Sequence, residues 1–152
     1  MKYYNYDIVF QEVPDEVSLA INFSNCPNHC KGCHSPHLCE DIGTELDDET
    51  LSEIISKYQH SITCVCFMGG DSNQERIIEM AQYINEHFGL KVAWYSGKSE
   101  MPKDITPFHY LKIGPYIQQF GGLDKTTTNQ RMYKINGTET VDITKRFWKK
   151  AI

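Results

Sequence analysis

Residues 17–33, Val-Ser-Leu-Ala-Ile-Asn-Phe-Ser-Asn-Cys-Pro-Asn-His-Cys-Lys-Gly-Cys, join an apolar segment directly to three closely spaced cysteines. In residues 17–24 apolar side chains alternate with small or polar ones, which is the period-two pattern of a β-strand. Pro27 disfavours continuation of a regular ladder, so the cysteines are expected in a loop at the carboxyl end of that strand. Ligands of open α/β sheets bind at this edge.

The three cysteines, Cys26, Cys30 and Cys33, have the spacing C-x3-C-x2-C. Three thiolates in this arrangement can bind three irons of a [4Fe-4S] cluster, whereas ordinary electron-transfer clusters use four cysteines. The fourth iron then has no protein ligand and is free to bind a small molecule. The number of cysteines therefore indicates a reactive cluster as much as their spacing does.

Zinc is the main alternative for these cysteines. Cys39, His34 or His37 could complete a tetrahedral zinc site with them. Three free thiols in a loop are the remaining interpretation, because cysteine often behaves as a small hydrophobic residue. A zinc site, however, leaves the turns at the ends of the later strands without explanation.

The rest of the sequence alternates predicted strands and helices. Helical spacing of apolar residues predicts helices around 51–58 and 77–88, and a short helix is expected at 144–150. Apolar runs predict further strands at 62–68, 91–95 and 110–113, and Asn136-Gly137 predicts a hairpin between 131–135 and 138–143.

This alternation predicts an α/β fold with a mostly parallel sheet, crossover helices and a C-terminal hairpin. A complete eight-unit barrel needs about 250 residues. We therefore expect an open partial (βα) barrel, in one domain over residues 1–152. Four turns should meet at its carboxyl edge: the cysteine loop, Gly69-Gly70-Asp71, Ser96-Gly97 and Gly114-Pro115.

Composition narrows the possible partners and locations. The net charge of −5 gives no general attraction for nucleic acid or an anionic membrane. No apolar run approaches the roughly 18 residues of a membrane span, and the first residues lack the features of a signal peptide. We expect a cytoplasmic protein, in which the six cysteines are metal ligands or buried thiols rather than disulfides.

C-x3-C-x2-C after one strand and a Gly-Gly-acid turn after the next resemble the radical S-adenosylmethionine superfamily. Within it the chain is most similar to the activating proteins of anaerobic (class III) ribonucleotide reductases. Residues 33–36, Cys-His-Ser-Pro, resemble that family's Cys-His-Asn-Pro, and residues 113–117, 121–124 and 128–131 resemble its C-terminal half. The resemblance covers roughly residues 15–135.

This resemblance implies a partial barrel of the radical SAM type, with a [4Fe-4S] cluster and S-adenosyl-L-methionine as cofactors. The amino and carboxylate groups of S-adenosylmethionine would chelate the open iron, and one electron would cleave a carbon–sulfur bond. The resulting 5′-deoxyadenosyl radical would take hydrogen from a glycine of the large reductase subunit. A small flavodoxin or ferredoxin is implied as the electron donor to this oxidoreductase.

Site residues follow from the same resemblance. Cys26, Cys30 and Cys33 are implied as the ligands of the cluster, and no catalytic residue is implied beyond them. The residues implied in binding S-adenosylmethionine are Gly32, Cys33, His34, Gly69, Gly70, Asp71, Ser96 and Lys112.

The implied contacts differ along S-adenosylmethionine. Residues 32–34 would lie against the adenine, and Asp71 would receive the ammonium group, with Gly69 and Gly70 allowing close approach of the backbone. Ser96 would reach the ribose or carboxylate, and Lys112 would pair with the carboxylate. Each has an ordinary structural alternative, which is a solvent-facing loop histidine, a plain turn, a capping serine or a lysine that points to water.

One segment departs from the pattern, and several alternatives remain. Relatives carry Gly-Pro-Gly-x-Arg before the first strand, whereas this chain has Val13-Pro-Asp-Glu16. Cys64 and Cys66 lie two apart in an apolar strand and are interpreted as core thiols. The alternative functions are activation of another glycyl-radical enzyme such as pyruvate formate-lyase, a small-molecule radical enzyme such as a deazaguanine synthase, and a zinc-stabilised binding module.

Overall fold

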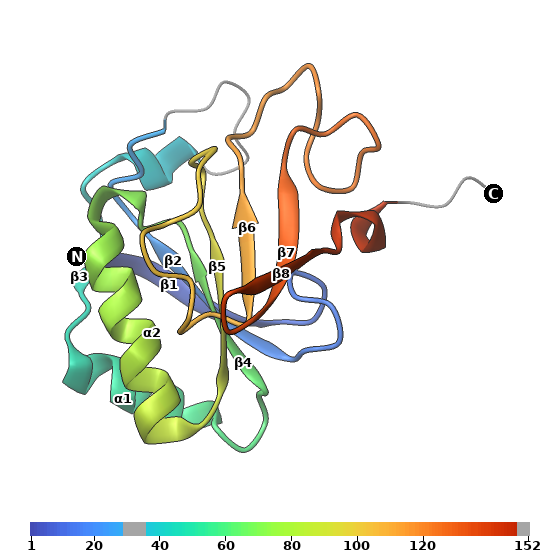
Figure 1. Cartoon of the computed structure of the whole chain (residues 1–152). Coiled ribbons are helices and arrows are strands. Elements are labelled where there is room, and N and C mark those ends of the chain that lie inside the picture. Colours follow the sequence, from blue (N-terminus) through green and yellow to red (C-terminus); the bar gives the residue numbers. More distant parts are fainter. Residues whose placement is uncertain (29–35, 149–152) are drawn as a thin grey trace.

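The computed structural model describes residues 1–28 and 36–148. These residues contain an eight-stranded mixed sheet of order β3-β1-β2-β4-β5-β6-β7-β8 (Figure 1). The strands are β1 (Lys2–Val9), β2 (Ser18–Phe23), β3 (Thr44–Glu45), β4 (Cys64–Met68), β5 (Lys91–Tyr95), β6 (Tyr110–Ile113), β7 (Arg131–Asn136) and β8 (Glu139–Asp142).

The centre of the sheet is parallel and its margins are antiparallel. Strands β2, β4, β5 and β6 pair in parallel, whereas β1 and β7 pair antiparallel to their neighbours. Every apolar run predicted as a strand forms one, and the hairpin at Asn136-Gly137 joins β7 to β8. The sequence did not predict β1 or β3, because neither has a regular alternation of buried and exposed residues.

Two α-helices form the crossovers on either side of β4. Helix α1 (Asp48–Tyr58) begins where the Asp47 side chain accepts a hydrogen bond from the Thr50 amide, at 2.7 Å. Helix α2 (Gln74–Phe88) is capped in the same way by Asn73, and it ends at Gly89, whose φ of 64° is left-handed. No helix of the described residues is long and apolar enough to cross a membrane.

The general alternation of strands and helices fails at one crossover, and one expected helix is shorter than predicted. No helix connects β5 to β6, because the connection contains Pro102 and Pro107, which interrupt helical hydrogen bonding. The final helix expected at 144–150 is a single 3₁₀ turn, η3 (Thr144–Phe147), and residues 149–150 lie outside the described part. Two further 3₁₀ turns are η1 (Pro36–Cys39) and η2 (Asp71–Asn73).

Alternate residues of each strand point to opposite faces of the sheet. On the face that we call the helix face, α1 and α2 cover the strands (Figure 1). Fully buried apolar side chains from strands and helices fill this layer, among them Leu19, Ile21, Phe23, Val65, Phe67, Trp94, Leu111, Leu51, Ile55, Ile77, Met80 and Ile84.

The opposite face, which we call the open face, is built from other residues of the same strands. Its buried core contains Val13, Cys64, Cys66, Ala93, Tyr110 and Met132. Cys64 and Cys66 are fully buried, as predicted for core thiols. Burial raises the pKa of Cys64 to about 12 and moves the pKa of Cys66 well above its usual value.

Residues 13–16, which replace the Gly-Pro-Gly-x-Arg stretch of the resembled family, pack against the open face. Val13 is fully buried, and the buried Glu16 carboxylate accepts from Lys91 Nζ at 3.1 Å and from the Tyr110 hydroxyl at 3.2 Å. Asp15 forms two hydrogen bonds of 2.8 Å with the Arg146 guanidinium of η3. The segment therefore ties the β1–β2 connection to the C-terminal part of the chain.

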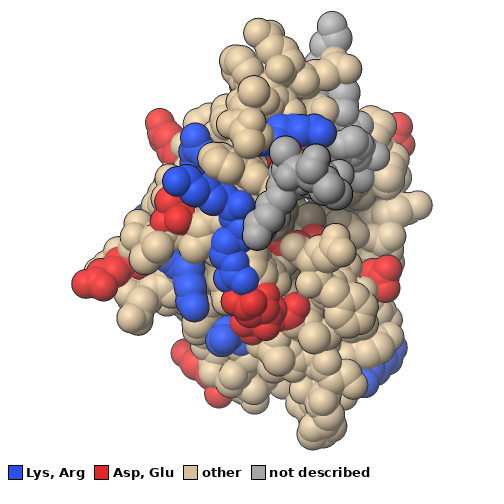
Figure 2. All heavy atoms as spheres, turned by 90° about the vertical axis from the view of Figure 1, so that its right-hand side faces the viewer, with Lys and Arg blue, Asp and Glu red and all other residues tan. Residues whose placement is uncertain are grey.

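The side of the molecule that carries β7, β8 and η3 shows a band of Lys and Arg side chains with acidic residues beside it (Figure 2). Arg146 is paired with Asp15, and Arg131 Nε lies 4.0 Å from Asp142 Oδ2. Because these two arginines have carboxylate partners, this part of the chain is not a uniformly positive surface.

Candidate functional site

Asp71 is at the centre of the turns that follow the parallel strands. Strand β4 ends at Met68, and the chain turns through Gly69 and Gly70, whose φ angles of 93° and 90° are left-handed. A non-glycine residue is strained in this conformation. The turn places the Asp71 side chain inside the protein, where the residue is only 8% exposed.

The Asp71 carboxylate joins three turns through hydrogen bonds. Oδ1 accepts from the Ser96 hydroxyl at 2.6 Å, and Oδ2 accepts from the Gly97 amide at 2.7 Å. Oδ2 also accepts from Asn28 Nδ2 at 2.9 Å, and Asn28 belongs to the cysteine loop. The carboxylate is therefore a shared acceptor for the turns after β2 and β5.

Lys112 brings the turn after β6 into the same network. This lysine is 8% exposed, and its Nζ donates to the Ser96 carbonyl at 3.1 Å and to the Gly114 carbonyl at 2.8 Å. The Nζ also lies 6.0 Å from the centroid of the Tyr95 ring. The alternative of a strand lysine that points to water is therefore wrong, and Ser96 links the buried Lys112 to the buried Asp71.

Ser96 has a structural role in the described residues. Its hydroxyl donates to Asp71 and accepts from the Lys98 amide at 3.1 Å, and the residue is 1% exposed. The hydroxyl thus caps the turn after β5, which was its structural alternative. Contact of Ser96 with a ribose or a carboxylate stays a prediction.

Cys26 is the predicted cluster ligand that the structure describes. Its amide donates to the Leu38 carbonyl at 2.8 Å, so the segment that leads into the cysteine loop is fixed to the segment that leaves it. Its half-buried thiol sulfur lies 3.6 Å from Asn28 Nδ2. Thiolate ligands of iron–sulfur clusters receive N–H donors of this kind, so the surroundings of Cys26 fit such a cluster. Cys30, Gly32, Cys33 and His34 lie outside the described residues.

Two of the candidates for a fourth zinc ligand, Cys39 and His37, lie in the described residues. Cys39 is half-buried in η1, and the exposed His37 ring packs edge-on against Tyr4, with ring centroids 5.0 Å apart. Within residues 1–28 and 36–148, no three His, Cys, Asp or Glu side chains gather as a possible metal site.

Sequence reasoning missed Asn28 and the role of Gly97. A Cβ atom at Gly97 would stand 2.4 Å from Asn28 Nδ2, so the amide occupies the space that a side chain at residue 97 would need. An asparagine in a loop has the same local signature as any turn residue. Its partner Asp71 is 43 residues away in sequence, and only the fold brings the two together.

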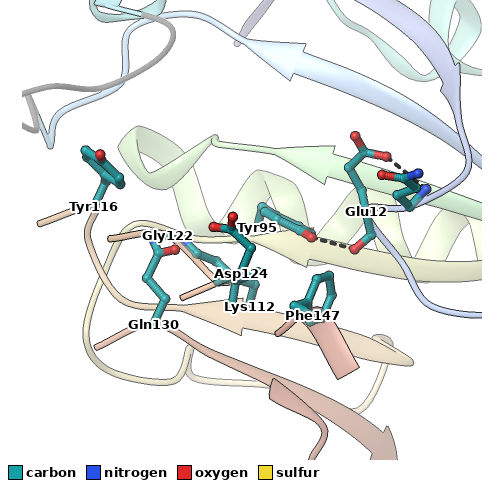
Figure 3. A pocket seen from close by; sticks show the side chains of 10 residues that line it. Glu12, Tyr95, Lys112, Tyr116, Gly122, Asp124, Gln130 and Phe147 are labelled. Carbon is teal, nitrogen blue, oxygen red and sulfur yellow. Dashed lines mark hydrogen bonds between the residues drawn. The ribbon is translucent and has the colours of Figure 1, made fainter. Parts of the chain in front are cut away.

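A cavity of about 550 Å³ adjoins this network on the open face (Figure 3). Tyr95 and Lys112 form part of its wall, and the loop after β6 supplies much of the remainder. Burial raises the pKa of Tyr95 well above its usual value, so its phenol is neutral at physiological pH. The lining residues are Gln11, Glu12, Tyr95, Lys112, Tyr116, Gly122, Leu123, Asp124, Gln130 and Phe147.

The sequence did not predict this cavity. Its wall combines residues 11–12, two strands, the loop of residues 116–130 and η3, which are far apart along the chain. The Tyr95 hydroxyl donates to the Glu12 carbonyl, so the β1–β2 connection forms one side of the cavity (Figure 3). Loop residues have no hydrophobic periodicity, so their sequence does not predict that these segments come together around a cavity.

Comparison with known proteins identifies the domain type. The model of the 4Fe-4S single cluster domain family matches residues 17–106, which is more than half of the chain. The matched segment runs from β2 through the cysteine loop to the turn at Asp71 and the network of Ser96. Searches of the curated proteins and of the solved structures each found no match. The match favours iron–sulfur over zinc, and the chain therefore belongs to the 4Fe-4S single cluster domain family, with a [4Fe-4S] cluster as its indicated cofactor.

Proposed function

We propose that this chain is a radical S-adenosylmethionine oxidoreductase that activates an anaerobic ribonucleotide reductase. It would cleave S-adenosylmethionine reductively and take hydrogen from one glycine of the large reductase subunit, which leaves a glycyl radical. The observation that carries the proposal is the buried Asp71–Ser96–Lys112 network, which is joined to the cysteine loop by Asn28. A site for electron transfer alone has no need of a buried acid and a buried cation beside its cluster.

Asp71 and Lys112 have opposite charges that suit the two ends of an amino acid. An α-amino acid group carries an ammonium and a carboxylate, so it would place the ammonium at Asp71 and the carboxylate near Lys112. A carboxylate has about four acceptor positions, and Ser96, Gly97 and Asn28 use three of those on Asp71. The described contacts therefore leave Asp71 the capacity to accept one further donor.

Gly69 gives such a ligand access to the backbone. A Cβ atom built on Gly69 would meet nothing closer than the Phe23 carbonyl oxygen, at 3.8 Å. Among the described residues, this position is glycine for its φ of 93° rather than for lack of space, and they leave room beside it for a ligand. Gly70 differs, because a Cβ there would stand 2.6 Å from Ile77 Cδ1 of α2.

The reaction needs one electron and one hydrogen atom. When bound, the reduced cluster would supply one electron to the sulfonium, so that methionine leaves and the 5′-deoxyadenosyl group takes hydrogen from the glycine Cα. The chain's own residues would hold the amino acid part, and the buried strand-end network would exclude water from it.

The cavity of the open face is the proposed entrance for the glycine segment of the reductase. Its volume of about 550 Å³ lies within the usual range of ligand sites. Lys112 belongs to both the network and the cavity wall, so a segment held there would adjoin the predicted cofactor site. A protein substrate suits this open sheet, because a backbone loop has to enter between its walls.

Anaerobic reconstitution with iron and sulfide tests the proposal. The loaded protein is treated with dithionite and S-adenosylmethionine, with and without the large reductase subunit, and 5′-deoxyadenosine is measured by chromatography. We expect 5′-deoxyadenosine and, with the reductase, a glycyl radical in the electron paramagnetic resonance spectrum. Cys30→Ala should abolish both products.

The controls separate the competing functions. Pyruvate formate-lyase in place of the reductase should give no glycyl radical, and a radical on that enzyme would reassign the partner. Full cluster loading without 5′-deoxyadenosine, even with the reductase present, would refute the radical mechanism. Bound zinc without inorganic sulfide would refute the cluster itself.

A further inference from the structure

One amide nitrogen bridges the cysteine loop and the buried carboxylate. Asn28 Nδ2 lies 3.6 Å from Cys26 Sγ and 2.9 Å from Asp71 Oδ2. A side-chain amide nitrogen carries two protons, so it can donate one to each acceptor. A Cys26 thiolate and the Asp71 carboxylate can only accept hydrogen bonds. The nitrogen of the Asn28 amide, and not its oxygen, therefore faces both of them.

The space around this amide is shaped for it. A Cβ at Gly97 would lie 2.4 Å from Asn28 Nδ2 and 3.0 Å from its Cγ, so any larger residue at position 97 would displace the amide. The Gly97 backbone amide donates to the same Asp71 oxygen as Asn28 does. Asp71 and residue 97 therefore hold the Asn28 side chain from two sides.

We propose that Asn28 is a positioning residue that fixes Cys26 Sγ and raises the reduction potential of the cluster through an N–H···S hydrogen bond oriented by Asp71. Reduction adds negative charge to the cluster and its sulfur ligands. Hydrogen-bond donors to those sulfurs favour the reduced form, and they are among the means by which proteins set cluster potentials. Asn28 thus acts on the cluster through Cys26 and does not touch a substrate.

This inference rests on the cluster that the family match indicates and does not require cleavage of S-adenosylmethionine. Its test is therefore performed on the reconstituted protein without S-adenosylmethionine or reductase. Failure of the radical mechanism would leave the inference standing, and an unchanged cluster potential would leave the radical mechanism standing.

The experiment compares Asn28→Ala and Gly97→Ala with the wild-type chain. Iron and sulfide are counted for each protein, and the potential is measured by redox titration followed by electron paramagnetic resonance. Both variants should have a lower potential, with the ratio of reduced to oxidised cluster at a fixed potential decreased three- to tenfold. A tenfold change corresponds to about 59 mV for a one-electron couple.

Asn85→Ala is the matched control. Asn85 of α2 is also half-buried and donates through Nδ2 to a single carbonyl, that of Pro107, at 2.8 Å. Its loss removes a similar amide on the helix face and should leave the potential unchanged. A wild-type potential in fully loaded Asn28→Ala would overturn the proposal. If that variant loads poorly, Gly97→Ala decides, because it keeps the asparagine and displaces chiefly its amide, with Asp71 Oδ2 at the ordinary contact distance of 3.4 Å. A wild-type potential in loaded Gly97→Ala would likewise overturn the proposal.

Discussion

The two faces of the sheet differ although the same strands build both. The helix face is covered by α1 and α2, and its core is built from apolar side chains, with Trp94 among the largest. The open face has the neighbouring residues of those strands, including Lys112, Cys66 and Tyr95, and it borders a cavity of about 550 Å³. Successive residues of one strand therefore lie alternately in the apolar core of the helix face and in the more polar open face.

This difference shows how a small α/β protein separates stability from chemistry. Apolar burial on the helix face contributes roughly 25 cal/mol for each Å² removed from water and needs no partner of defined geometry. Each buried polar group on the other side needs a hydrogen-bond partner, and Asp71 and Lys112 have theirs in the strand-end turns. The period of two in a strand provides both environments at once.

Removal of a large side chain from the helix face should produce the greatest loss of stability. Trp94→Ala deletes a fully buried ring and its 2.7 Å hydrogen bond to the Gly69 carbonyl. Urea denaturation should show a loss of about 3–5 kcal/mol in the free energy of unfolding. A loss under 1 kcal/mol would show that the helix face is not the stabilising layer.

Asp71 tests the polar network at the edge of the sheet. Asp71→Ala leaves the buried donor of Ser96 and the partly buried donors of Gly97 and Asn28 without this acceptor and should cost about 1–3 kcal/mol of unfolding free energy. Asp71→Asn should recover most of that loss, because an amide can accept two of these bonds and donate to the serine hydroxyl.

Asp71→Ala and Asp71→Asn also test whether the proposed reaction needs the negative charge of Asp71 or only its hydrogen bonds. Both variants lack the carboxylate charge, so both should form less than about 1% of the wild-type 5′-deoxyadenosine, a loss of roughly 2.7 kcal/mol in the relevant barrier. Wild-type product formation by Asp71→Asn would show that Asp71 serves only to connect the turns.

Tyr95 tests the cavity wall next to Trp94 in the same strand. Tyr95→Phe keeps the ring and removes the hydroxyl that donates to the Glu12 carbonyl, so it should destabilise the protein by only about 1 kcal/mol. Urea denaturation of Tyr95→Phe and Trp94→Ala side by side compares the loss of unfolding free energy on the open face with that on the helix face. An equal loss in both variants would remove the distinction between them.

The smallest effect is expected from the ion pair of Asp15 and Arg146, which is exposed. Hydrogen bonding and the charge of Arg146 hold the pKa of Asp15 below its ordinary 3.8. The pair therefore stabilises the fold above that pH, and its contribution is lost as pH falls through the lowered pKa of the folded state.

Thermal unfolding of Arg146→Ala measures this effect. The variant should melt slightly below the wild type at pH 7 and together with it in strong acid, where Asp15 is protonated in both. Disruption of the Arg76–Asp48 pair, at 2.8 Å on the helix side, is the matched control. A difference for Arg146→Ala that persists unchanged into strong acid would exclude the ion pair as its cause.

Periodic segments could be predicted from the sequence, and contacts between loops could not. The alternation in residues 18–23 and the apolar spacing in residues 77–88 each gave the correct element, because burial of one side selects these patterns. The rule that parallel strands end at one edge also predicted the meeting of Asp71 with Ser96. No helix was predicted between β5 and β6 and none forms, so this parallel crossover departs from the general strand–helix alternation, and its prolines disfavour a helix.

The remaining features depend on tertiary structure. Asn28 and the cavity arise where segments distant in sequence meet, and no local pattern marks them. Strand β1 is held mainly by its pairing with β2 rather than by an alternation of its own. Cluster ligation by Cys30 and Cys33 stays a prediction from their spacing.

The raised pKa values of Cys64 and Cys66 bear on how the protein acquires its metal. Only a deprotonated thiol binds iron or zinc, and both of these thiols keep their protons at neutral pH. As thiolates, Cys64 and Cys66, which are two of the three cysteines outside the C-x3-C-x2-C motif, would compete for iron. Burial in the folded sheet thus keeps Cys64 and Cys66 protonated, and we expect the folded protein not to load metal at these two thiols.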